Sequence, residues 1–120
     1  MPAAVIVVHD DPTMLEATLK ALRDAGHDCA GFSDPMAALD AVENESRLQV
    51  LATRLNFSPG KLNGLALARM LKFKQPAMHA VFATTPEDDL EEAAKTGRVL
   101  AEPLDPQELV EAVGKLRRGS

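Results

Sequence analysis

Residues 3–12 read AAVIVVHDDP, and this stretch predicts an inner strand of a parallel sheet. Its first six residues are apolar on both faces of an extended chain, which is typical of a strand covered by helices on both sides. Asp11 suits the N-cap of a following helix, and Pro12 suits its first position, where a missing N–H costs nothing. Ligands in open parallel sheets bind beyond the carboxyl ends of the central strands, so we expect His9 and Asp10 to face a functional crevice.

Composition and charge favour one globular domain over residues 1–120. The 13 Lys and Arg against 18 Asp and Glu give a net charge of -5, which argues against a general attraction to nucleic acid or anionic membranes. The single Cys29 excludes an intramolecular disulfide. No stretch approaches the roughly 20 apolar residues that cross a bilayer, and no charged leader precedes the first apolar run. A cytoplasmic setting is therefore expected.

Strands and helices are predicted to alternate along the whole chain. After the first strand, short apolar runs predict strands at 27–32, 48–52, 80–83 and 98–101. Helices are predicted where apolar residues recur at helical spacing and where capping residues, prolines or glycines mark the ends. They run over about 12–25, from Pro35 to Val42, from Gly64 to near Lys74, from Thr85-Pro86-Glu87 to Gly97, and from Asp105-Pro106 onward. Residues 54–63, which include Ser58-Pro59-Gly60, are predicted to form a loop. This alternation predicts a right-handed parallel βαβ sheet with helices on both faces.

Four motifs lie in a fixed order along this pattern: residues 5–12, Arg54-Leu55 with 63–65, Ala83-Thr84, and 102–106. In that order they resemble the receiver domain of bacterial two-component response regulators over nearly all of the chain. The resemblance implies an α/β, flavodoxin-like (βα)5 fold, a doubly wound parallel sheet in three layers with strand order 2-1-3-4-5. It also implies a role in phosphorelay signal transduction and no enzymatic activity.

The chemistry of this family depends on five positions. Two acidic residues after the first strand hold magnesium, because phosphoryl transfer concentrates negative charge on oxygen atoms. An aspartate ending the third strand accepts the phosphoryl group, a Thr or Ser ends the fourth strand, and a Lys before a cis-proline ends the fifth. The resemblance places the following residues of this chain at the five positions and the proline: His9 and Asp10 at the acidic pair, Ala52 at the acceptor, Thr84 at the hydroxyl, and Glu102 at the lysine, before Pro103.

These substitutions predict a degenerate phosphoacceptor pocket. Alanine has no nucleophile, and no aspartate lies between Glu45 and Phe82 that another alignment would bring to the acceptor position. Glu102 in place of a lysine turns an attraction for the phosphoryl group into a repulsion, each about 3 kcal/mol at about 5 Å and an effective dielectric near 20. Asp11 could take one acidic position if it shifted by one residue, but the N-cap is the alternative role.

We therefore expect a stand-alone, atypical receiver domain, a pseudo-receiver, that acts by phosphorylation-independent protein–protein interaction. The resemblance implies a contact surface on the fourth helix, fifth strand and fifth helix, including residues 87–95 and 105–118. The expected partner is a histidine kinase or another regulator, with a homodimer as a further option. No nucleic acid, membrane or obligatory cofactor is expected.

Two alternatives remain open at the sequence level. Asp10, together with Glu102, offers hard oxygen ligands for a divalent cation such as Mg²⁺, whereas the other reading pairs Glu102 with His9 or a nearby Lys. His9 beside carboxylates is a candidate pH-responsive group or a residue that fills a former ion site. The alternative function is a flavodoxin-like small-ligand or metal-binding domain, but no glycine-rich phosphate loop follows the first strand.

Overall fold

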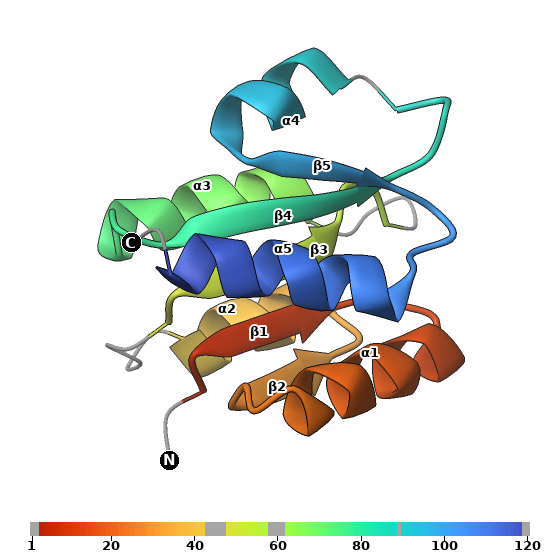
Figure 1. Cartoon of the computed structure of the whole chain (residues 1–120). Coiled ribbons are helices and arrows are strands. Elements are labelled where there is room, and N and C mark those ends of the chain that lie inside the picture. Colours follow the sequence, from red (N-terminus) through yellow and green to blue (C-terminus); the bar gives the residue numbers. More distant parts are fainter. Residues whose placement is uncertain (1–2, 43–47, 58–61, 89, 119–120) are drawn as a thin grey trace.

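The computed structural model describes residues 3–42, 48–57, 62–88 and 90–118, and Figure 1 shows one sheet between two layers of helices. The strands are β1 (Val5–Val8), β2 (Cys29–Phe32), β3 (Val50–Arg54), β4 (His79–Thr84) and β5 (Arg98–Ala101). The helices are α1 (Pro12–Asp24), α2 (Pro35–Val42), α3 (Gly64–Lys74), α4 (Leu90–Thr96) and α5 (Pro106–Arg118). All strand pairs are parallel in the order β2-β1-β3-β4-β5, which confirms the predicted fold.

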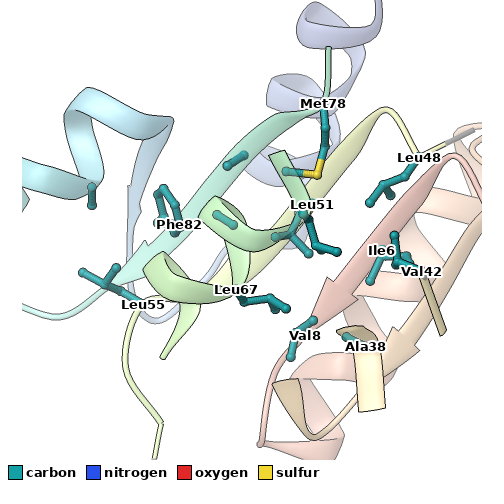
Figure 2. Packing of buried hydrophobic residues seen from close by; sticks show 14 residues of the cluster. Ile6, Val8, Ala38, Val42, Leu48, Leu51, Leu55, Leu67, Met78 and Phe82 are labelled. Carbon is teal, nitrogen blue, oxygen red and sulfur yellow. The ribbon is translucent and has the colours of Figure 1, made fainter. Parts of the chain in front are cut away.

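The sheet separates two hydrophobic clusters because alternate side chains of each strand point to opposite faces. Val5 and Val7 pack with α1 and α5, whereas Ile6 and Val8 pack with α2 and α3. Figure 2 shows the second cluster, in which Ile6 and Val8 lie with residues of α2, α3 and β4. Each fully buried Val, Leu or Phe side chain contributes about 1.5–3 kcal/mol. All four residues of β1 are buried, as the apolar run predicts.

The helix boundaries follow local signals in the sequence. The Asp11 side chain accepts hydrogen bonds from the N–H groups of Thr13 (3.0 Å) and Met14 (3.4 Å), so its predicted role as an N-cap is confirmed. Gly26 has a φ of 90°, a left-handed conformation that glycine adopts without strain after the end of α1. Among the described helices, none is long and apolar enough to cross a bilayer.

Several predicted boundaries are wrong. β2 begins at Cys29 instead of at His27, and β3 begins at Val50 instead of at Leu48. β3 continues to Arg54 instead of ending at Ala52, because the Leu55 N–H donates to the Ala83 carbonyl (2.9 Å) and prolongs the pairing with β4. Arg54 therefore belongs to a strand and not to the predicted loop.

α4 begins at Leu90 instead of at Thr85. The Asp88 N–H donates to the Thr85 carbonyl (3.1 Å), and the Thr85 N–H donates to the Asp88 carboxylate (2.7 Å). This turn takes up the residues that were expected to start the helix. The predicted Ser58-Pro59-Gly60 loop segment lies outside the described residues.

Candidate functional site

Four polar side chains meet where β1, β3 and β5 end: His9, Asp10, Arg54 and Glu102. The parallel register places Val7 opposite Ala52, and Ala52 opposite Val81, on the face covered by α1 and α5. Because strand side chains repeat every two residues, the register carries Arg54 toward the same face as Ala52. Sheet register and strand length therefore bring residues from distant parts of the chain to one edge.

The guanidinium of Arg54 joins the two carboxylates of this group. Its Nη1 donates to Asp10 Oδ1 at 2.7 Å, and its Nε donates to Glu102 Oε2 at 2.9 Å. The three side chains are 27%, 30% and 13% exposed, so water screens these contacts less than it screens surface ion pairs. One fixed positive charge thus neutralises much of the negative charge at the edge of the sheet.

His9 is buried and links the same network to the start of α1. Its Nε2 lies 2.7 Å from Glu102 Oε1, and its Nδ1 accepts a hydrogen bond from the Asp11 backbone N–H at 3.0 Å. An Nδ1 that accepts a hydrogen bond carries no proton, so the contacts fit a neutral imidazole with its hydrogen on Nε2. Of the two readings that the sequence leaves open, this contact fits the one that pairs Glu102 with His9 or a nearby Lys, and the partner is His9.

The ion pairs shift the titration of the groups they join. Burial alone would raise the pKa of Asp10, but the hydrogen bond and the charge of Arg54 outweigh burial and hold this pKa below its ordinary value. Burial alone would lower the pKa of Arg54, but the two carboxylates raise it. Both shifts favour the charged forms, so the Asp10 carboxylate and the Arg54 guanidinium are ionised at neutral pH.

Ala52 lies two residues before Arg54, and both residues line a small cavity. The cavity has a volume of about 10 Å³, and Val81, Ala83 and Leu104 are among its other lining residues. That space suits at most one water molecule. This cavity is therefore too small for an organic ligand.

Thr84 does not join the other predicted site residues. Its hydroxyl donates to the Leu100 carbonyl on β5 (3.4 Å), and Ala83 lines the cavity in its place. Pro103 follows Glu102 through a cis peptide bond, as the resemblance implies. Asp11 is engaged at the N-terminus of α1.

The donor set of this edge does not fit a magnesium site. Asp10 and Glu102 direct one oxygen each to Arg54, and a fixed cation repels a second one in the same space. Within the described ranges, no group of three His, Cys, Asp or Glu side chains is placed to hold a metal ion.

Arg54 is the residue of this network that the sequence pattern does not single out. The sequence places it in a motif and predicts a loop there. Its separation from Ala52 by two residues was the available signal, because an extended strand places positions i and i+2 on one face. Reading that signal required knowing that β3 continues past Ala52.

Comparisons with known proteins agree with this architecture. A family model described as the response regulator receiver domain matches residues 5–114. No match was found among curated proteins.

Solved structures with the same fold are numerous. A response regulator receiver domain protein from Clostridium thermocellum superposes with a TM-score of 0.83 at 20% identity, covering 95% of this chain and 93% of that one. A receiver protein from Sinorhizobium medicae gives 0.82 at 20% identity, covering 96% and 94%. The chemotaxis protein CheY4 of Vibrio cholerae gives 0.78 at 20% identity, covering 97% and 99%. At such identity these structures establish the common fold.

Proposed function

This chain belongs to the response regulator receiver domain family, and from that premise we propose that it signals without being phosphorylated. Receiver domains are signalling domains of two-component systems and interact with histidine kinases and other regulators. In this proposal, residues 1–120 form a single pseudo-receiver domain that acts by binding another signalling protein and catalyses no reaction.

The contact of Arg54 with Asp10 and Glu102 is the observation that carries the proposal. A phosphoryl acceptor needs a carboxylate nucleophile and a cation beside it. Ala52 offers no such nucleophile at the position that the resemblance assigns to the acceptor, and Arg54 already neutralises the carboxylates nearby. The pocket thus has a fixed charge distribution that needs neither magnesium nor phosphate.

The surface formed by α4, β5 and α5 is the proposed contact site for the partner. α5 presents exposed Glu108, Glu111 and Lys115 while it buries Leu109 and Val113 against the sheet. Such a polar outer face can make a specific, reversible contact. The partner recognises this surface in the unmodified protein.

A backbone NMR titration tests the proposal. Magnesium alone, and then magnesium with beryllofluoride, is added to the wild-type domain while the amides of His9, Asp10, Arg54 and Glu102 are followed. We expect no saturable shift, because Arg54 holds both carboxylates.

A variant with a restored pocket serves as the control for this titration. In Ala52→Asp/Arg54→Asn the acceptor carboxylate is present and the fixed cation is gone, so magnesium should produce saturable shifts around Asp10. A wild-type response to beryllofluoride that spreads into β5 and α5 would contradict the proposal.

A further inference from the structure

The pair Asn63-Gly64 lies between β3 and α3, where Asn63 precedes the helix and Gly64 is its first residue. Asparagine before glycine is a pair prone to deamidation, because glycine has no side chain to keep its backbone nitrogen away from the amide carbon. Asn63 is exposed to water. The other two asparagines of the sequence precede Glu45 and Phe57, so the chain carries this pair once.

The fold requires glycine at the second position of this pair. Gly64 is buried, and a Cβ there would overlap the carbonyl oxygen of Arg54 at the end of β3. Asn63 is the N-cap of α3, because its Oδ1 accepts a hydrogen bond from the Ala66 N–H at 2.8 Å. The packing of α3 against β3 therefore keeps an asparagine N-cap directly before an obligatory glycine.

Deamidation of this pair needs water and no other partner. The Gly64 N–H gives its proton to hydroxide, and the nitrogen attacks Cγ of Asn63. The new N–Cγ bond closes a five-membered succinimide, while the Cγ–Nδ2 bond breaks and Nδ2 takes up a proton and leaves as ammonia. Water then opens the ring at either of its two carbonyl groups. One opening gives aspartate, and the other gives isoaspartate, in which the main chain runs through the former side chain.

The native contacts oppose the first step of this reaction. The Gly64 N–H donates to the Leu55 carbonyl at 2.8 Å, so its proton is held by the end of β3 and shielded from hydroxide. The side-chain amide of Asn63 is held in turn by the Ala66 N–H. Opening of the first turn of α3 breaks both hydrogen bonds, and helix ends open more readily than helix centres.

The two products differ in how they fit this junction. Isoaspartate adds one carbon atom to the main chain before Gly64, where the Arg54 carbonyl leaves no room for it. Aspartate keeps the normal main chain and an oxygen atom at the N-cap, and its negative charge is favourable at the start of a helix. Only the isoaspartyl product should therefore prevent α3 from closing onto β3.

We propose that Asn63-Gly64 is a deamidation site controlled by the first turn of α3. Each opening of this turn releases the Gly64 nitrogen from Leu55 and lets the ring form, and an isoaspartyl product keeps the turn open afterwards. The modification separates α3 from the end of β3, the strand that carries Arg54. The inference does not depend on the proposed function, because it concerns the chain by itself.

Peptide mapping by mass spectrometry of wild-type protein aged at mildly alkaline pH tests the site. Asn63 should deamidate at least about tenfold more slowly in the native protein than in the chain unfolded by guanidinium. Asn56 is also exposed but precedes a phenylalanine, so it is the matched internal control and should keep its amide while Asn63 reacts. Equal rates for Asn63 in the two states, or modification of Asn56 before Asn63, would overturn the proposal.

Hydrogen exchange of the Gly64 amide measures the opening independently. Denaturant below the unfolding transition should speed this exchange and the deamidation of Asn63 by the same factor. A native protein whose Gly64 amide exchanges while Asn63 remains unmodified at the rate found for the unfolded chain, corrected for the open fraction, would contradict the proposal.

The isolated products test the effect on the junction. The isoaspartyl protein should lose the protection of the Gly64 amide and show shifted Leu55 and Arg54 amides, whereas the variant Asn63→Asp should keep the wild-type pattern. An isoaspartyl protein with full Gly64 protection, or an Asn63→Asp variant without it, would overturn the assignment of the first turn as the controlling element.

Discussion

Arg54 gives the pocket a positive charge that belongs to the polypeptide. Its planar fork reaches Asp10 and Glu102 through separate nitrogens, and Glu102 uses its other oxygen for His9. A lysine has a single nitrogen and lacks the fixed planar arrangement of donors that arginine offers to two carboxylates. The arrangement therefore depends on the geometry of arginine as well as on its charge.

Replacement of Arg54 should destabilise the fold. Arg54→Ala leaves two partly buried carboxylates without their cation, and we expect a loss of about 2 kcal/mol in the free energy of unfolding. Arg54→Lys keeps the charge but loses the fork, so its loss should be smaller, about 1 kcal/mol. Urea unfolding at pH 7 measures both variants, and an Arg54→Ala protein as stable as the wild type would show that the network contributes nothing.

At the scale of the elements, β3 and α3 meet at Gly64. A Cβ on Gly64 would lie 2.0 Å from the Arg54 carbonyl oxygen, so only glycine allows α3 to start this close to the end of β3. The packing of α3 and the position of Arg54 are coupled at this point.

Gly64→Ala should therefore reduce the free energy of unfolding by about 2 kcal/mol, because the added methyl group displaces backbone. Gly114→Ala is the matched control. A Cβ there meets only the flexible end of Arg118, at 3.2 Å, and alanine in place of glycine within α5 should stabilise by about 0.5–1 kcal/mol. The melting temperature should fall for Gly64→Ala and rise for Gly114→Ala. Equal changes in the two variants would show that a methyl group at position 64 does not disturb the packing of α3 on β3.

A second polar network joins α5 to the opposite edge of the sheet. Arg117 donates through Nη1 to His27 Nδ1 (2.7 Å) and through Nε to Gln49 Oε1 (2.7 Å). Burial lowers the pKa of His27, and the charges of Arg117 and Arg118 lower it further. The neutral imidazole is therefore the form that the fold favours.

The lowered pKa of His27 determines the direction in which the free energy of unfolding changes with pH. Since the folded-state pKa lies below the ordinary value near 6.5, the stabilisation from His27 is complete above about pH 6.5 and declines as the pH falls through the folded-state value. The unfolded chain binds the proton first in that window. The stability difference between the wild type and His27→Gln, measured by urea unfolding from pH 8 to pH 5, should move in favour of the variant on acidification. A difference that stays constant with pH would remove His27 as the cause.

The elements that sequence predicted well are those with local causes. The N-cap at Asp11, the stop at Gly26 and the apolar run of β1 depend on neighbouring residues alone. The end of β3 depends on pairing with β4, a contact between segments about 30 residues apart, and the local composition at Arg54 suggested a loop. The resemblance places Thr84 in the pocket, whereas in the structure its hydroxyl donates to the Leu100 carbonyl of the neighbouring strand.

At the scale of the whole molecule, the Arg54 network ties together the ends of three strands. Asp10 follows β1, Arg54 ends β3 and Glu102 follows β5, so one side chain restrains both sides of the sheet. Any ligand that competed for these carboxylates would have to displace it. The response of global stability to metal ions therefore reports on the pocket.

Metal ions should raise the melting temperature of the Arg54→Ala variant but not that of the wild type. The melting temperature of the wild type should not change with Mg²⁺ or Mn²⁺, whereas Arg54→Ala frees the carboxylates of Asp10 and Glu102, whose oxygens are ligands for both cations. A ligand at 100 times its dissociation constant stabilises a fold by about 2.7 kcal/mol. A rise in melting temperature for Arg54→Ala alone would support the view that the Arg54 guanidinium takes the place of a metal ion. An equal rise in both proteins would show that metal binds elsewhere or alongside Arg54.

The covalent attachment of the guanidinium also determines what can regulate the protein. A diffusing ion competes at its bulk concentration, but Arg54 meets Asp10 and Glu102 as an intramolecular partner whose effective concentration is set by the length of one side chain. A phosphate donor would not alter that occupancy. In the proposed phosphorylation-independent function, the output would therefore follow the number of molecules present, and synthesis and degradation of the chain would set it.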